Sequence, residues 1–320
     1  TGSRVWIDWN QNCDFDDAGE EYNLGVTSNQ NDGETSNSPL SILIPSDASL
    51  GQTVMRVSTQ FGAYPTSCLQ NFDGEVEDYT LNVISLISWT GTTSSDWSTT
   101  SNWSTGAVPT SSDIVVINGT FINEPIISSS IDAEAQSVTV ATGNTLTIDE
   151  TSSLTVSGDF TNSGTVTLNS TEDDFSSLIV TGTAIGNIVY NRYVNSYDTN
   201  ALGGGWDLIG SPAGMTISAF IAANGEAGSD VIKVLGTNYA FSQYDNETGQ
   251  WNRYATASQI GSFEAGQGYS MATNAGDGAT VAFTGAMKTA DQSIDIINNN
   301  GVNGVGRRWN LVSNPFPSYI

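Results

Sequence analysis

The sequence contains no histidine, and this absence limits the chemistry open to it. Without an imidazole there can be no Ser-His-Asp or Cys-His triad and no histidine-ligated zinc. Carboxylates are the main titratable groups left for acid–base chemistry.

Positive charge is almost as scarce. The 320 residues include 8 Lys and Arg against 34 Asp and Glu, which gives a formal net charge of −26. No Lys or Arg lies between Arg56 and Arg192. Such a chain cannot neutralise a phosphate backbone, so we expect no nucleic-acid partner, and anionic lipid surfaces should repel it. Hard, oxygen-preferring cations such as Ca²⁺ are the natural partners of this charge.

Long apolar runs are also missing: none approaches the ~20 residues that span a bilayer, so we expect no membrane insertion. Charged residues make up only 13%, so Ser, Thr, Asn and Gly must supply much of the polar surface, which favours strands and turns. Two cysteines, Cys13 and Cys68, permit one disulfide in an extracellular protein. Because the chain opens without a Met and stops in mid-pattern, we expect a segment of a longer protein.

The patterns predict an all-β chain with module boundaries at 1–85, 86–190, 191–304 and 305–320. In the first module Val5, Ile7 and Trp9 alternate, which places them on one face of a strand. Further strands are expected at 41–44, 53–57 and 79–83.

The second module shows an internal repeat of apolar pairs at spacing two, separated by Gly, Asn, Asp and Ser. Each unit is too short to fold alone, so stacking must bury these positions. A small parallel β-solenoid fits best, and an antiparallel meander is the alternative. The pairs are Val138/Val140, Leu146/Ile148, Leu154/Val156, Val166/Leu168, Leu178/Val180 and Ile188/Tyr190.

The third module is richer in aromatic residues and is expected to be sandwich-like. Its segment 206–212, with Trp first and Pro last, recurs at 309–315, where a second, truncated copy is expected to start. Residues 217–224 are the one helix candidate. Tyr244 and Trp251 flank a hairpin signal and are expected to pair across it, with a carbohydrate contact as the alternative for Trp251.

The strongest chemical signal is the acidic segment 8–20. Its oxygen-bearing side chains alternate, as in a loop that wraps one Ca²⁺ ion. Two departures stand out: Cys13 replaces the usual glycine, and the last acid falls one position late. A solvated acidic turn is the alternative, but six carboxylates within residues 8–21 would repel one another without a cation. The predicted ligands are Asp8, Asn10, Asn12, Asp14, Asp16 and Glu20.

The motif Gly74-Glu75-Val76-Glu77-Asp78, taken with the strand 5–9 and the acidic loop, closely resembles the GEVED domain. The resemblance covers roughly residues 1–85, without the family's N-terminal strands. It implies an extracellular, non-catalytic β-sandwich from a large secreted protein of Bacteroidota-type bacteria. Glu75, Glu77 and Asp78 either complete the ion site or cap the closing strand.

Trp89, Trp97 and Trp103 form a second block. It resembles the entry to β-solenoids in the same class of adhesin-like proteins, and the 206–212 repeats resemble segments of type IX secretion cargo. Capping of the open solenoid end is the favoured interpretation, because that end must be covered. The alternative is a sugar-stacking platform, with Trp97, Trp103 and Trp251 as candidate glycan contacts.

No phosphate-cradling motif or nucleophile elbow is present. We therefore expect a non-enzymatic segment of a large secreted or surface-displayed bacterial protein, acting in adhesion or as a structural stalk. Its partner would be a surface ligand such as a polysaccharide or another cell-surface protein. The alternative is an accessory, substrate-binding region of a secreted hydrolase whose catalytic domain lies outside the segment.

Overall fold

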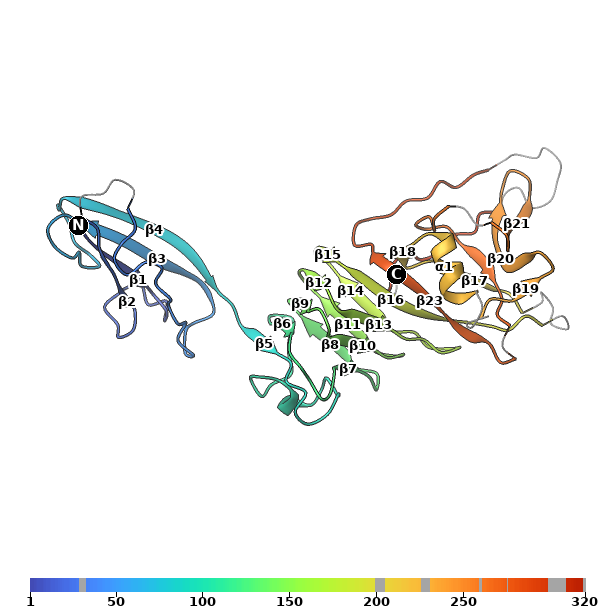
Figure 1. The fold of residues 1–320 in the computed structure, drawn as a ribbon, viewed down its shortest axis with the longest axis horizontal. Coiled ribbons are helices and arrows are strands. Elements are labelled where there is room, and N and C mark those ends of the chain that lie inside the picture. Colours follow the sequence, from blue (N-terminus) through green and yellow to red (C-terminus); the bar gives the residue numbers. More distant parts are fainter. Residues whose placement is uncertain are drawn as a thin grey trace. The chain divides into compact units, whose positions relative to one another are not determined.

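The computed structural model describes residues 1–28, 33–198, 205–225, 231–258, 261–274, 276–298 and 309–318. The chain divides into two compact units, Thr1–Ser85 and Leu86–Ile320 (Figure 1). The expected boundary after residue 85 coincides with this division, whereas the other three expected modules fall within the second unit. No helix in the described ranges is long and apolar enough to cross a membrane.

The first unit is built on one antiparallel sheet with the order β2-β1-β3-β4. Strand β1 is buried on both faces: Val5, Ile7 and Trp9 enter the small core with Val83, while Trp6 lies 1% exposed on the other side. The predicted face of β1 is therefore confirmed. The strands are β1 (Gly2–Ile7), β2 (Glu21–Val26), β3 (Gly51–Gln60) and β4 (Gly74–Val83).

Two expectations for this unit differ from the structure. The described residues of the unit form a single sheet, so the second layer of a sandwich is not seen there. The segment 41–44 is not a strand, and Leu43 is 88% exposed. Pro39 and Pro45 flank this segment, and because neither has an N–H to donate, it is poorly suited to a sheet ladder.

The second unit begins as a parallel β-solenoid, as predicted. Three sheets of parallel coil strands form its faces, and each complete coil contributes one strand to each face. The first face holds β5 (Leu86–Ser88), β6 (Ile114–Ile117), β9 (Ser137–Val140), β12 (Phe160–Asn162) and β15 (Ala184–Ile185). The second holds β8 (Asp132–Ala135), β11 (Ser153–Val156) and β14 (Ser177–Val180). The third holds β7 (Ile126–Ile127), β10 (Thr145–Ile148), β13 (Thr165–Leu168) and β16 (Asn187–Val194).

The parallel register stacks equivalent apolar residues of successive coils. Leu154 pairs with Ala133 on one side and Leu178 on the other, and all three are buried. The predicted apolar pairs all lie in strands, and every member except the partly buried Tyr190 is in the core. The spacing analysis missed β12, because only Phe160 of this short strand is a large apolar residue.

Three tryptophans close the N-terminal end of the solenoid, next to the short 3₁₀ helix Thr100–Asn102. Trp89, Trp97 and Trp103 are at most 3% exposed and meet edge to face, with ring centroids 4.9 and 4.6 Å apart. This arrangement corresponds to the cap, since buried rings shield apolar coil residues from water.

The solenoid passes directly into the C-terminal part of the unit, because β16 also pairs antiparallel with β23 (Ala279–Met287). β18 (Ala213–Gly214) extends this sheet. A second sheet contains β17 (Asp207–Ile209), β22 (Tyr269–Met271), β20 (Asn238–Asp245), β19 (Val234–Leu235) and β21 (Gln250–Ala255). An aromatic cluster of Phe220, Phe241, Phe263 and Phe283 fills the core of this part.

The predicted helix is α1 (Ile217–Asn224). It begins where the Thr216 side chain accepts a hydrogen bond from the backbone N–H of Ala219. The predicted hairpin is also confirmed: Tyr244 pairs with Trp251, their ring centroids are 5.3 Å apart, and Gly249 has φ 69°.

The two copies of the Trp-initiated repeat lie in the same module rather than starting separate ones. Ile209 of the first copy pairs with Tyr269, and Val312 of the second forms a bridge with Gln267 on the same chain segment. Gly210 and Ser313, which occupy equivalent repeat positions, touch so closely that only glycine fits at 210.

Candidate metal centre

The acidic loop connects β1 to β2 and is shaped by its own side chains. The Oδ1 atoms of Asn10, Asn12 and Asp14 each accept a hydrogen bond from the backbone N–H two residues later, at 2.9–3.0 Å. These successive turns explain why oxygen-bearing residues occupy alternate positions. The alternation seen in the sequence is therefore a pattern of backbone turns.

Three carboxylates converge inside the loop. One ligand oxygen each from Asp14, Asp17 and Glu20 lies within 4.8 Å of the others. Asp17 Oδ2 also accepts hydrogen bonds from the side-chain amides of Asn10 and Asn12, both at 2.7 Å. Five polar side chains thus meet around one point at the end of β1.

Glu20 is the most constrained member of this cluster. It is 2% exposed, and its Oε1 accepts the backbone N–H of Trp9 at 2.8 Å. Its Oε2 is buried without a hydrogen-bond partner among the described residues. Burial raises the pKa of Glu20, and the charges of Asp8 and Asp17 act in the same direction.

The predicted ligand set is only partly brought together. Asp8 is 5% exposed, but its oxygens accept the backbone N–H groups of Asn12 and Cys13 at 3.1 and 3.0 Å. Asp16 accepts a hydrogen bond from Ser67 Oγ at 3.1 Å and is not in the carboxylate cluster. Asp17 was not predicted, although its spacing of three from both Asp14 and Glu20 is a signal in the sequence.

Cys13 occupies the loop position where a calcium loop usually has glycine, and the reason is visible in the backbone. Its φ is 72°, in the left-handed region that favours glycine. Cys13 and Cys68 are both free and exposed, so the predicted disulfide is not formed in this structure. The loops that carry them touch, since Ser67 contacts Asp16.

The acids of the GEVED motif lie along β4 itself and do not reach the carboxylate cluster. Asp78 forms an ion pair with Arg56 at 2.7 Å, and Tyr79 donates a hydrogen bond to Glu77. The Arg56 guanidinium lies 5.1 Å from the centre of the Phe15 ring. Asp78 therefore supports the acidic loop through Arg56, a role that neither alternative from the sequence described.

The candidate glycan contacts divide into two groups. Trp97 and Trp103 are 0% and 3% exposed, so their rings have no free face for a sugar. Trp251 is 45% exposed. Together with Trp206, Leu208 and Arg253 it borders a 410 Å³ cavity on the sheet that contains β17, β20, β21 and β22.

Comparison with known proteins assigns families to both units. The GEVED domain model matches residues 2–82, as the motif predicted. A second family, described as a domain of unknown function (DUF8693), matches residues 88–320. No curated protein and no solved structure matches the chain. Because the second match covers most of its length, the chain belongs to the DUF8693 family.

Proposed function

We propose that the chain is a non-catalytic, calcium-stabilised segment of a large secreted or surface-displayed bacterial protein, acting in adhesion or as a structural stalk. The observation that supports calcium binding is the buried, unpartnered Oε2 of Glu20, beside Asp14 and Asp17. A buried carboxylate oxygen without a donor is unfavourable unless a cation meets it. The three carboxylates offer hard oxygen ligands, which suits Ca²⁺.

Asn10, Asn12, Asp14, Asp17 and Glu20 are the residues that would hold the ion. When bound, Ca²⁺ supplies positive charge that offsets the repulsion within the loop. Glu20 accepts the backbone N–H of Trp9, whose side chain lies in the core of the first unit. Binding at the loop would therefore stabilise the sheet as well as the loop.

A structural and adhesive role is supported by composition and architecture together. The chain has no histidine, and its acidic surface disfavours nucleic acid and anionic lipid. Export by a type IX route from a Bacteroidota-type bacterium belongs to the same proposal, because the Trp-initiated repeats resemble segments of such cargo and the GEVED motif resembles modules of such bacteria.

The second candidate is an accessory, polysaccharide-binding region of a secreted hydrolase. It is favoured by the exposed Trp251 beside Trp206 in the 410 Å³ cavity, because exposed aromatic faces are suited to stacking on sugar rings.

The calcium proposal is tested with the full chain in EDTA and in millimolar Ca²⁺. We expect a Kd of ~10⁻⁴–10⁻³ M by calorimetry, and a stabilisation of ~2.7 kcal/mol at a hundredfold excess over Kd. Trypsin reports on the first unit, since it can cut there only after Arg4 and Arg56. Ca²⁺ should slow cleavage after Arg56, because folded β3 shields this site.

Asp14→Ala should abolish both the binding heat and the protection. Asp47→Ala is the matched control, since it removes an exposed carboxylate of the same unit outside the loop. Equal calcium responses of the two variants would show that the acidic run is only a solvated turn.

A further inference from the structure

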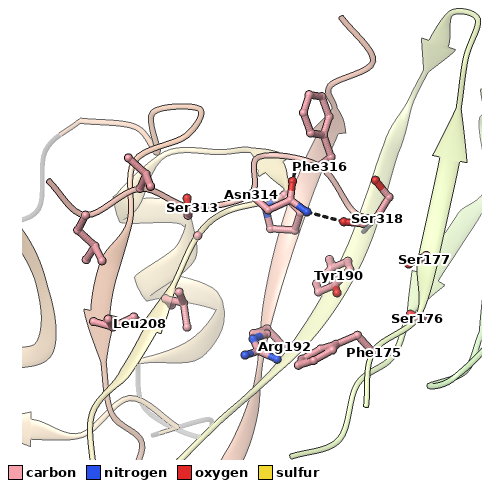
Figure 2. A pocket seen from close by; sticks show the side chains of 15 residues that line it. Phe175, Ser176, Ser177, Tyr190, Arg192, Leu208, Ser313, Asn314, Phe316 and Ser318 are labelled. Atoms are coloured by element: carbon pink, nitrogen blue, oxygen red, sulfur yellow. Dashed lines mark hydrogen bonds between the residues drawn. The ribbon is translucent and has the colours of Figure 1, made fainter. Parts of the chain in front are cut away.

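A cavity of 360 Å³ in the second unit lies between the two copies of the Trp-initiated repeat (Figure 2). The first copy contributes Leu208 to Gly210 and Pro212, the second contributes Leu311 to Asn314, and strand β16 contributes Tyr190 and Arg192. The two repeats therefore line one side of the same cavity. The last coil of the solenoid lines the other side.

Arg192 is the only charged residue among the described residues that line this cavity. Its guanidinium lies 4.2 Å from the centre of the Phe175 ring. Its Nη1 is shielded from solvent and has no hydrogen-bond partner, and no carboxylate of the described chain forms an ion pair with it. In a chain of net charge −26, a partly buried cation without an ion pair among the described residues calls for a partner from outside.

The nearby acid that could have paired with Arg192 is already engaged. Asp207 accepts hydrogen bonds from the backbone N–H and the side-chain amide of Asn195, at 2.7 and 2.9 Å. Burial lowers the pKa of Arg192, while the charges of Tyr190 and Asp207 act in the opposite direction. The guanidinium nevertheless stays charged at neutral pH, because an arginine pKa lies so far above it.

The rest of the lining indicates what kind of anion fits. Phe175 and Tyr190 contribute rings to the lining, and Figure 2 shows Arg192 beside Phe175. The hydroxyls of Ser176 and Ser313 donate to the carbonyls of Asn169 and Gln267, which leaves their lone pairs free to accept. No acidic side chain of the described lining could hold an amine.

We propose that this cavity binds a sugar acid, whose carboxylate pairs with the Arg192 guanidinium. A hexuronate combines the three features that the lining selects: one carboxylate, hydroxyl donors for the serine oxygens, and an apolar ring face for the aromatic side chains. The site is in a different unit from the calcium loop, so it does not depend on the calcium proposal.

The test is calorimetric titration of the full chain, in EDTA, with galacturonate, galactose and acetate. We expect galacturonate to bind with a Kd on the order of 1 mM, and galactose and acetate to bind at least tenfold more weakly. Binding of galactose equal to that of galacturonate would overturn the role of Arg192. Equal binding of acetate would show a general anion site and overturn sugar recognition, and no binding of galacturonate would refute the proposal outright.

Arg192→Met keeps the apolar stem and removes the charge. It should weaken galacturonate binding at least tenfold without lowering the melting temperature, because it removes an unpaired cation. Lys288→Met is the matched control, since Lys288 is an exposed cation of the same unit that lines neither this cavity nor the one beside Trp251. Unchanged affinity in Arg192→Met would refute the assignment. Should this variant not fold, Arg192→Lys keeps the charge without the planar fork, and an affinity equal to wild type would contradict recognition by the guanidinium.

Discussion

Arg56 and Asp78 form a two-point ion pair across β3 and β4, with Nε to Oδ1 and Nη2 to Oδ2 both at 2.7 Å. The same guanidinium donates to the Ser67 carbonyl and lies over Phe15. One arginine thus connects the last acid of the GEVED motif to the acidic loop and to the turn that carries Cys68. The motif therefore contacts the loop through Arg56, and its acids are not members of the carboxylate cluster.

Asp78→Asn should destabilise the first unit by no more than about 1 kcal/mol at pH 7, because the pair is partly exposed. The hydrogen bonds from Arg56 lower the pKa of Asp78 below its usual 3.8. Its contribution is therefore present above the unfolded-state pKa and is lost as pH falls through the folded-state value. Urea unfolding at pH 7 and at acid pH measures this, with Glu75→Gln as control. If Asp78→Asn is still less stable than wild type at acid pH, the ion-pair explanation is contradicted.

Glu20→Gln should have opposite effects with and without calcium. Because burial raises the pKa of Glu20 above 4.5, the metal-free native state holds a proton that the unfolded chain releases. The stability of the metal-free wild-type protein should thus fall as pH rises from 4.5 through the folded-state pKa of Glu20. In EDTA at pH 7 Glu20→Gln should be the more stable protein, and in Ca²⁺ the less stable one. Urea unfolding provides the measurement, and identical pH profiles for the two proteins would refute a perturbed Glu20.

Cys13→Gly should stabilise the reduced protein by about 1 kcal/mol, because it relieves a side chain held at φ 72°. Cys68→Gly is the control, since Cys68 is not at positive φ. Both variants are compared with wild type by urea unfolding in reductant. A loss of stability in Cys13→Gly would mean that contacts of the thiol outweigh the backbone strain.

Air-oxidised protein should contain a Cys13–Cys68 disulfide, although both thiols are free in the structure. Both are exposed and lie on loops that touch, so access does not prevent pairing. Closing about 55 residues should add ~4 kcal/mol by restricting the unfolded chain. Thiol titration of unfolded, unreduced protein decides the matter, and two reactive groups would refute the bridge.

Leu154→Ala should destabilise the second unit by about 2–5 kcal/mol, because it opens a cavity in the middle of a stack between Ala133 and Leu178. Thr139→Ala, on the exposed face of β9, should change stability little. Thermal unfolding followed by circular dichroism compares them. Equal melting temperatures would mean that the coils do not depend on interior packing.

Local patterns in the sequence determined most of the secondary structure. Alternation placed the buried face of β1 and six of the coil strands, namely β9, β10, β11, β13, β14 and β16. The hairpin around Gly249 and the helix 217–224 followed from equally local signals. These features succeed because a strand's period of two and a turn's backbone angles depend on neighbours along the chain. The acidic loop was identified for the same reason.

Tertiary structure decided which of these residues meet. Stacking of the coils decides features that no local pattern encodes. These are the three faces of the solenoid, a strand as short as β12 and the burial of Trp97. In the loop, hydrogen bonds from backbone N–H groups hold Asp8 outside the carboxylate cluster. Side-chain amides of Asn10 and Asn12 donate to Asp17, which lies within it. Arg192 and the second repeat are more than a hundred positions apart in the sequence, and only the tertiary fold brings them to the same cavity. The sequence alone does not show that they are close in space.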